Sequence, residues 1–398
     1  MDNAQEQLAR SLGDGHRVIH GVAGSGKTLI LQYRAKELAA ENDSDKPILV
    51  ICFNILLARI LASRLKNNRI EVLHFHDWCK LQKERYQLKV ISGEENYPER
   101  LAATICAAVE DGTIAAEQYH AVLIDEGHDM AADWLRALAK MPDSKHERLL
   151  LLYDDAQTLY PNRHGIGFTL SSVGIKAPGR TRILHTNYRN SKEIHEYAMR
   201  FIHHFLSDTP IATEQPFNPF NLDEQVLSIT SSPISDDAIP MVASQSGGGY
   251  AGIEPQYYRA TSRKDEIGHI IKMIHTWKQE GAAYGDIAVL CYTKHYGQEL
   301  VQELQEAALP MQNLIEKTGR EQYAPERDKL NLCTLHSSKG GEFHRVIIAG
   351  IDTLPDKKEQ QEASARLIYV GITRAQNHLL LTAAADNTFT ALLHTTSE

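Results

Sequence analysis

One eight-residue stretch near the N-terminus limits what this chain can fold into more than any other feature. Residues 21–28 read Gly-Val-Ala-Gly-Ser-Gly-Lys-Thr, which matches the phosphate-binding pattern G-x-x-x-x-G-K-[ST] in full. The apolar residues Val18 and Ile19 precede it, and a helical pattern over residues 29–39 follows it. A P-loop requires this strand–loop–helix context, so the stretch predicts an α/β domain that binds a nucleoside triphosphate.

The chemistry of phosphate binding explains the residue types in this stretch. Glycines let the backbone turn tightly, so that its N–H groups point at one phosphate chain, and the start of the helix adds a positive dipole end. We expect Lys27 to reach the β- and γ-phosphates of ATP and the Thr28 hydroxyl to hold Mg²⁺. The other expected ATP contacts here are Gly21, Gly24, Ser25 and Gly26. A glycine turn that binds nothing is the alternative, and the complete match disfavours it.

An acidic pair is placed where a P-loop domain needs one. Residues 121–124 are a short apolar run, and Asp125 and Glu126 follow it directly. At the end of a buried strand, Asp125 would lie near the Mg²⁺, and Glu126 would orient and deprotonate an attacking water. A strand that ends in a solvated acidic turn is the alternative interpretation. The P-loop upstream favours the catalytic one.

Apolar runs bounded by turn residues recur along both halves of the chain. Such runs are typical of buried parallel strands, and helical patterns separate them here. The runs cover residues 47–53, 70–76, 149–153, 182–184, 257–260, 286–291, 330–334, 346–349 and 377–382. The sequence therefore predicts an α/β fold with two domains, residues 1–185 and 186–398. We expect a small helical insertion near residues 79–118 and irregular structure over the proline-rich residues 208–255.

Composition narrows the class of protein further. The 398 residues carry a net charge of −9, which argues against nucleic-acid binding over the whole surface but allows a local groove. No run of about 18 apolar residues is present, and the polar start lacks a secretion signal, so we expect no membrane association. The five scattered cysteines fit a reduced cytoplasmic protein rather than a disulfide framework or a zinc site.

Short motifs in a fixed order give the chain a resemblance to a known family. With Gln5, the segments that carry it are residues 21–28, 52–54, 74–77, 125–129, 154–160, 187–189, 334–343 and 367–375. Each segment is a weak signal, but their order and spacing over nearly the whole chain make chance agreement negligible. The set resembles the UvrD/Rep branch of superfamily 1 DNA helicases.

The resemblance implies two RecA-like domains, with ATP and Mg²⁺ in the cleft between them and single-stranded DNA across the tops of both. The residues that it assigns to catalysis are Lys27, Glu126, Gln157, Arg189 and Arg374. Those that it assigns to ATP outside the P-loop are Gln5 and Tyr188 at the adenine and Glu342 at the ribose. Those that it assigns to DNA are Phe53, Asn54, His76, Tyr160, Thr334 and His336. Thr28 and Asp125 would hold the metal, and movement along DNA would run 3′ to 5′.

Three of these side chains also fit a less specific role on the residues alone. Gln5 could be a solvent-facing amide and Arg189 a surface arginine. His76 lies two residues after His74 in the predicted strand 70–76, so the two would share one strand face, and no cysteine or carboxylate of that strand lies on this face to complete a metal site. A structural or polar-contact role is therefore favoured over metal binding for this histidine pair.

The chain also departs from the family pattern. Gly127 and His128 replace an Ala-Gln pair, Tyr153 stands where a glycine is usual, and Gly341 replaces a leucine. Both domains lack room for the large insertions of many relatives, so we expect the duplex-engaging parts to be small or missing. The chief alternative is a nucleotide-gated sensor that binds single strands or DNA ends and licenses a partner nuclease, or serves a repair or defence protein. A small-molecule P-loop kinase would leave the arginine motifs without a role.

Overall fold

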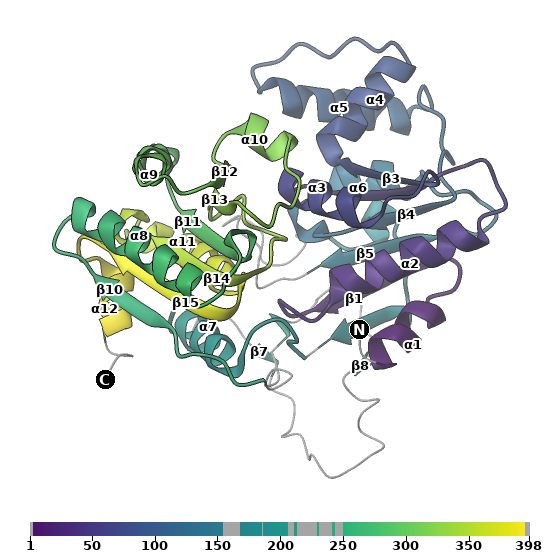
Figure 1. Ribbon diagram of the computed structural model, residues 1–398. Helices are drawn as coiled ribbons and strands as arrows, with labels where there is room; N and C mark the ends of the chain where they lie inside the picture. Colours follow the sequence, from purple (N-terminus) through teal and green to yellow (C-terminus); the bar gives the residue numbers. More distant parts are fainter. Residues whose placement is uncertain are drawn as a thin grey trace.

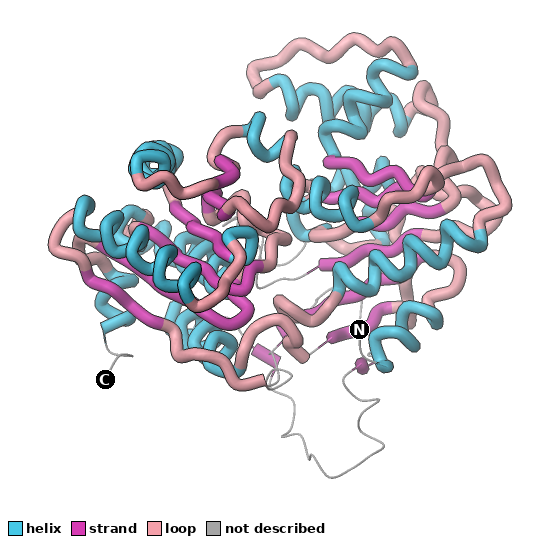
Figure 2. Tube along the Cα trace, in the orientation of Figure 1, coloured by secondary structure: helices cyan, strands magenta, loops and turns pink. Residues whose placement is uncertain are grey.

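Each half of the chain contributes a sheet of mostly parallel strands with helices packed on both faces (Figures 1 and 2). The computed structural model describes residues 3–153, 168–184, 186–205, 211–212, 229–230, 241–242 and 250–394. The first domain holds the first sheet and helices α1–α6, and the second domain holds the second sheet and helices α7–α12. The prediction of an α/β fold with two parallel sheets is confirmed.

The first sheet places the P-loop strand near its centre. Its strand order is β3-β2-β4-β5-β1-β6-β8, and every described pairing is parallel except that of β6 with β8. Its strands are β1 (His16–Gly21), β2 (Ile48–Cys52), β3 (Ile70–His74), β4 (Ala121–Ile124), β5 (Leu149–Tyr153), β6 (Thr181–Leu184) and β8 (Ile229–Thr230). The carboxyl ends of parallel strands meet at one edge, so the segments that follow β1, β4 and β6 gather there.

The helices of the first domain begin at residues suited to the start of a helix. The Asn54 side chain accepts a hydrogen bond from Leu57 N before α3, and Asn96 caps α5 in the same way. The helices are α1 (Asn3–Ser11), α2 (Lys27–Glu41), α3 (Ile55–Arg64), α4 (Phe75–Arg85), α5 (Tyr97–Glu110) and α6 (Ala132–Ala139). Helices α4 and α5 form a pair that projects from this domain (Figure 1).

The second sheet has the order β10-β15-β14-β11-β13-β12, and all its pairings are parallel. Its strands are β10 (Gln256–Arg259), β11 (Ile287–Cys291), β12 (Met311–Asn313), β13 (Leu330–Thr334), β14 (Phe343–Ala349) and β15 (Ala375–Ala383). Its helices are α7 (Lys192–Phe205), α8 (Arg263–Gln279), α9 (Lys294–Glu306), α10 (Lys317–Glu321), α11 (Lys358–Ile372) and α12 (Thr388–His394). Helix α7 follows the first sheet in the chain but packs against α11 and β15 of the second domain.

Burial on both faces explains why the strands are almost wholly apolar. All five residues of β5 and of β11 are buried, as are those of β2 and β13. A leucine, isoleucine or valine that leaves water in this way contributes about 1.5–3 kcal/mol before entropy is counted. The apolar core on one face of the second sheet also includes Ala23, Leu56 and Ile60 of the first domain. The two domains therefore share apolar packing where α3 meets the second sheet.

The structure differs from two sequence expectations. The strand expected over residues 70–76 ends at His74, and residues 75–76 open helix α4 because the chain turns at Phe75, whose buried ring stacks on Trp134. Within the stretch 208–255, where irregular structure was expected, β8 joins the first sheet, and β7 (Ile211–Ala212) pairs with β9 (Met241–Val242). Among the described residues, no helix combines the length and the apolar character needed to cross a bilayer.

Candidate functional site

The loop between β1 and α2 has the backbone shape of a phosphate cradle. Gly24 and Gly26 have φ values of +73° and +83°, a region that disfavours residues with a Cβ. A Cβ on Gly24 would meet the side chain of Asn187, and one on Gly26 would meet that of Gln5. The bare backbone therefore leaves a concave surface of N–H groups at the start of α2.

Two side chains of this loop point inward. Lys27 is buried, and its ammonium group donates hydrogen bonds to the carbonyl oxygens of Gly21 and, at 2.9 Å, Val22. Ser25 is also buried, and its hydroxyl oxygen has no hydrogen-bond partner among the described residues. The loop thus holds a cation and a hydroxyl whose polar capacity an anionic ligand would satisfy.

The acidic pair after β4 lies beside the start of α2. Thr28 Oγ1 donates a hydrogen bond of 2.9 Å to Asp125 Oδ2, and the backbone N–H of Glu126 donates one of 2.9 Å to Asp125 Oδ1. Burial, and then the charge of Glu126, raise the pKa of Asp125. Glu126 itself has a φ of 53°, which turns its carboxylate away from the direction of the strand. The expected metal ligands Thr28 and Asp125 are therefore neighbours.

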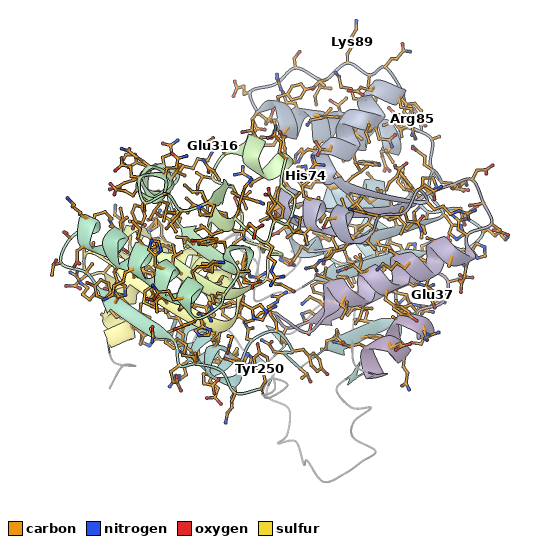
Figure 3. All side chains as sticks on the ribbon, in the orientation of Figure 1. Glu37, His74, Arg85, Lys89, Tyr250 and Glu316 are labelled. Carbon is orange, nitrogen blue, oxygen red and sulfur yellow. The ribbon has the colours of Figure 1, made fainter. Side chains whose placement is uncertain are left out.

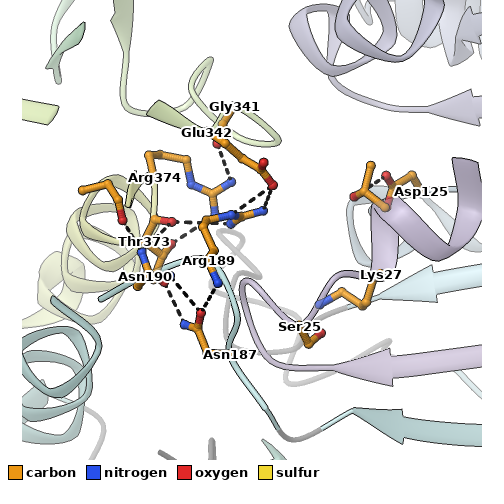
Figure 4. A network of polar contacts seen from close by, with 12 residues as sticks. Ser25, Lys27, Asp125, Asn187, Arg189, Asn190, Gly341, Glu342, Thr373 and Arg374 are labelled. Atoms are coloured by element: carbon orange, nitrogen blue, oxygen red, sulfur yellow. Dashed lines mark hydrogen bonds and ion pairs between the residues drawn. The ribbon is translucent and has the colours of Figure 1, made fainter. Parts of the chain in front are cut away.

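A second group of charged residues comes from the chain after β6 and from the second domain. Arg189 donates to Glu342 Oε1 from Nη2 at 2.7 Å and from Nε at 3.1 Å (Figure 4). The charge of Arg189 is the main cause of the lowered pKa of Glu342, against the opposing effect of burial. These two predicted ATP-site residues are thus brought together, and each is the partner of the other.

Arg374 lies in the same cluster but does not reach the cavity described below. It is fully buried, and its guanidinium donates to Val370 O at 2.9 Å, Thr373 Oγ1 at 3.0 Å and Gly341 O at 3.4 Å. Figure 4 shows Arg374 on the side of Arg189, across from Lys27. All three of these acceptors belong to the second domain.

A cavity of about 610 Å³ opens between these two groups of residues. Its volume lies in the range of small-ligand sites. Predicted site residues that line it are Gln5, Gly24, Ser25, Gly26, Lys27, Thr28, Glu126, Tyr188, Arg189 and Glu342. Gly21, Asp125 and Arg374 do not line it, and Gln157 lies outside the described residues. The structure therefore brings most of the predicted ATP contacts to one place.

The end of the cavity expected to hold the base is formed by the side chains of Gln5 and Tyr188, from two segments of the chain. Gln5 is buried, and its Nε2 donates a hydrogen bond of 3.0 Å to Ser25 O, so that α1 is tied to the P-loop. The backbone N–H of Tyr188 bonds to Gly24 O at 2.9 Å, while its ring is 41% exposed. Tyr188 therefore presents part of its surface at the wall of the cavity, where a flat ligand could stack on the ring.

Several lining residues were missed by the sequence analysis. Arg64 ends α3, and Tyr250 contacts Arg189 O at 2.8 Å and Gln376 O at 2.7 Å through its hydroxyl. Gln32 and His344 also line the cavity. A cation in the last turn of a helix, as Arg64 is, is a common pattern, so no local signal singled it out.

The two domains are joined beside the cavity by a buried ion pair. Lys339 Nζ donates to both carboxylate oxygens of Asp129 at 2.8 Å and to His128 Nε2 at 2.9 Å. All three side chains are almost wholly buried. Burial, and then the charge of Lys339, hold the pKa of His128 well below its usual value, so the imidazole is neutral.

The predicted DNA contacts of the first domain form an aromatic cluster. The ring of Phe53 lies 5.9 Å from His76 and 5.5 Å from Trp134, and His76 and Trp134 are 5.3 Å apart. Burial lowers the pKa of both His74 and His76, so these rings are neutral at pH 7. Figure 3 places His74 near the boundary between the two domains. Trp134, on α6, was not predicted as part of this surface.

The predicted DNA contacts of the second domain lie after β13. Thr334 Oγ1 bonds to Ser337 Oγ at 2.9 Å, and the ring of His336 faces Tyr292 at 6.1 Å. Asn54 Nδ2 donates across the boundary to Ser337 O at 3.5 Å, which links the two sets of contacts. Tyr160, the remaining predicted contact, lies outside the described residues.

Close backbone packing fixes this edge of the boundary. Gly340 has a φ of +77° and faces Leu57 of α3, and a Cβ at residue 340 would lie 2.7 Å from Leu57 Cδ1. Such a distance is too short for a carbon–carbon contact, so glycine permits the approach. The second domain thus rests directly on α3 of the first.

Fold and site together define a class of protein. A P-loop and an acidic pair at the carboxyl edge of one parallel sheet face arginines beside a second parallel sheet, as in P-loop NTPases with two α/β domains. Residues 183–319 and 311–386 match the UvrD-like helicase C-terminal domain, and residues 5–163 match a family described as an AAA domain. The chain belongs to the UvrD-like helicase family.

Curated relatives agree with this assignment. A probable DNA helicase of Mycoplasma pneumoniae is 26% identical over 292 residues, which cover 69% of this chain and 45% of that protein. DNA helicase II of Escherichia coli is 37% identical over 93 residues, covering 21% of this chain and 13% of that protein. ATP-dependent DNA helicase Rep of Buchnera aphidicola is 44% identical over 63 residues, covering 14% and 10%. The chain thus aligns with less than half the length of each of these relatives.

Proposed function

We propose that this chain is a DNA-dependent ATPase that moves along single-stranded DNA, 3′ to 5′, as a DNA helicase of the UvrD type. The observation that carries the proposal is the cavity with the P-loop on one wall and Arg189 and Glu342 on the other. A nucleotide held there contacts both groups of residues, so its hydrolysis alters the contact between the domains. The names of the relatives support DNA as the polymer along which the chain moves.

The residues present fit ATP with Mg²⁺. Gly24 and Gly26 leave a cradle that a Cβ would fill, and the buried Ser25 hydroxyl faces no described partner. Thr28 and Asp125 offer two oxygen ligands, which suits an ion that takes its other ligands from phosphates and water. When bound, Mg²⁺ neutralises charge that develops on the phosphates.

Different residues of the chain take different roles in ATP hydrolysis. Glu126 accepts the proton of an attacking water, because its buried carboxylate has an oxygen with no hydrogen-bond partner among the described residues. Lys27 and Arg189 place positive charge on the two sides of the cavity, where it stabilises negative charge in the transition state. Glu342 orients the Arg189 guanidinium at the cavity wall through two hydrogen bonds.

Single-stranded DNA is expected to lie across the aromatic cluster of the first domain and the segment after β13. Rings such as Phe53 stack on bases without regard to sequence, and the neighbouring Thr334 and His336 offer polar contacts to the backbone. A movement of the second domain at the cavity would be passed to the expected DNA surface by the segment after β13. This segment carries both Lys339, which bonds to Asp129, and Ser337, which bonds to Asn54. DNA repair, recombination or defence is the setting that we propose for such a motor.

One observation favours a second function, a nucleotide-gated DNA sensor that licenses a partner nuclease. Arg374 is fully buried and does not line the cavity, an arrangement that would suit a protein that binds ATP and hydrolyses it slowly. Such a protein would bind DNA stably and recruit its partner according to the bound nucleotide. It would show no directional movement along the strand.

The deciding experiment measures ATP hydrolysis by the purified chain with and without single-stranded DNA. Glu126→Gln serves as the control, since it keeps the shape of the side chain and removes its basicity. We expect strong stimulation by DNA that the variant loses, followed by displacement of a block at one strand end only. Slow hydrolysis that ignores DNA, together with tight DNA binding, would favour the sensor and contradict the motor.

A further inference from the structure

The buried histidine beside the acidic pair has one ring nitrogen between two charged groups of opposite sign. His128 Nε2 lies 2.9 Å from Lys339 Nζ and 3.3 Å from Glu126 Oε2. An ammonium group can only donate, so Nε2 accepts from Lys339, and the ring proton is then on Nδ1. In that tautomer Nε2 has no proton to give to Glu126.

The surroundings of Glu126 agree with this assignment. Its Oε2 is buried and has no hydrogen-bond partner among the described residues, although Nε2 of His128 is 3.3 Å away. The two acceptor atoms thus lie 3.3 Å apart with no proton between them. A carboxylate held in this way lacks a donor that would fix its orientation.

We propose that His128 is a positioning residue for Glu126. Contact with Lys339 of the second domain determines whether the ring accepts a hydrogen bond from Lys339 or donates one to Glu126. While Lys339 is in contact, His128 accepts from it and Glu126 is not oriented. When the second domain moves and Lys339 withdraws, the ring gives its Nδ1 proton to a water molecule, takes up a proton from water at Nε2, and donates this new N–H to Glu126. The imidazole stays neutral throughout, so no net proton is taken up or released.

The geometry explains why a histidine here differs from an amide side chain. Histidine presents the same nitrogen to both neighbours, so the two hydrogen bonds exclude each other. A glutamine presents an oxygen and an NH₂ group, which can accept from Lys339 and donate to Glu126 at the same time. His128 therefore makes the orientation of the base depend on the position of the other domain. This inference rests on the proposed ATPase function.

Three variants test the proposal through ATP turnover with and without single-stranded DNA. His128→Gln is expected to raise the DNA-free rate about fivefold, the effect of one added hydrogen bond of about 1 kcal/mol, and so to reduce the stimulation by DNA. His128→Phe is expected to lower the DNA-stimulated kcat with the KM for ATP unchanged. Lys339→Met is expected to raise the DNA-free rate, and to have no such effect when combined with His128→Phe.

Thermal unfolding of each variant separates positioning from a purely structural role. Equal loss of kcat and stability in all variants, with no gain in His128→Gln, would overturn the inference. So would DNA-free and DNA-stimulated rates in His128→Gln that match those of the parent chain. If turnover depends on Glu126 but not on residue 128, only this inference fails. If Glu126→Gln leaves turnover unchanged, the proposed ATPase function fails and this inference fails with it.

Discussion

Arg189 gives two hydrogen bonds to one carboxylate oxygen of Glu342, at 2.7 and 3.1 Å, and so closes an ion pair at the wall of the cavity. Glu342 belongs to the turn before β14, whereas Arg189 follows the last long strand of the first sheet. The pair therefore joins segments 153 residues apart. It places a paired cation and anion side by side on the cavity wall.

Replacing Lys27 with alanine should abolish ATP turnover while the fold stays intact. The ammonium group donates to the carbonyl oxygens of Gly21 and Val22 in the P-loop and lines the cavity, so its removal acts first on the cradle. Steady-state ATP hydrolysis and circular dichroism measure the two effects. Lys36→Ala, an exposed lysine on the same helix, is the matched control and should behave like the parent chain. Near-normal turnover in Lys27→Ala would refute the P-loop assignment.

The Arg189–Glu342 pair should contribute stability that depends on pH. Arg189 lowers the pKa of Glu342 below its unfolded value of about 4.3, so the contribution is full above that pH and is lost as the pH falls through the folded pKa. The Glu342 side chain is 32% exposed, so we expect less than about 1 kcal/mol. Urea midpoints of the parent chain and Glu342→Gln at pH 7, 5, 4 and 3 measure it.

The difference in stability between the parent chain and Glu342→Gln should become smaller toward the lowest pH. Glu359→Gln, at an exposed glutamate on α11, provides the control and should show almost no difference at any pH. A stability difference that grows below pH 4 would have the wrong sign for this pair.

Arg374→Met should weaken the fold and the chemistry together. The guanidinium is fully buried, and its loss removes the described donor to Gly341 O and one of two donors to Val370 O, which keeps Thr373 Oγ1, at a cost of about 1–3 kcal/mol. If Arg374 also reaches the transition state, turnover at saturating ATP falls at least about 1,000-fold with little change in nucleotide affinity. Urea unfolding, ATP hydrolysis and nucleotide titration separate these effects. Weakened nucleotide binding with an unchanged maximal rate would place Arg374 outside the reaction.

Phe53→Ala should weaken single-stranded DNA binding without changing ATP binding. Loss of one base-stacking contact costs about 1–3 kcal/mol, or roughly 5- to 150-fold in affinity. Fluorescence anisotropy with a labelled oligonucleotide measures it, and Trp134→Ala should have a similar effect because the two rings are 5.5 Å apart. Tyr284→Ala, at the start of β11 and so at the opposite edge of the second sheet, is the control. Unchanged DNA affinity in both cluster variants would remove this surface from the DNA path.

The parallel strands could be predicted because their residues are apolar on both faces. The run over residues 149–153 matches β5 from end to end, and the P-loop pattern marks the turn after β1. Residues 70–76 were predicted less well, since the pattern continues past His74 while the chain turns into α4. There the buried Phe75, rather than local sequence, decides where the strand ends.

The candidate site could be predicted where motifs are local. Thr28 and Asp125 follow from two separate motifs, and their contact follows from the order of the strands. Hydrogen bonds between side chains and residues far apart in the sequence could not be predicted. The motifs do not indicate that Arg189 donates to Glu342 or that the Tyr250 hydroxyl reaches Gln376 O. The burial of Arg374 likewise depends on how α11 packs, and sequence motifs do not describe packing.

The contact between Gly340 and Leu57 fixes how closely the two domains can approach. Because no side chain stands between that backbone and α3, any larger residue at position 340 would clash with Leu57 and hold the domains apart. Neighbouring residues of the same two segments make the hydrogen bond from Asn54 to Ser337, so such a substitution would also separate the two sets of expected DNA contacts.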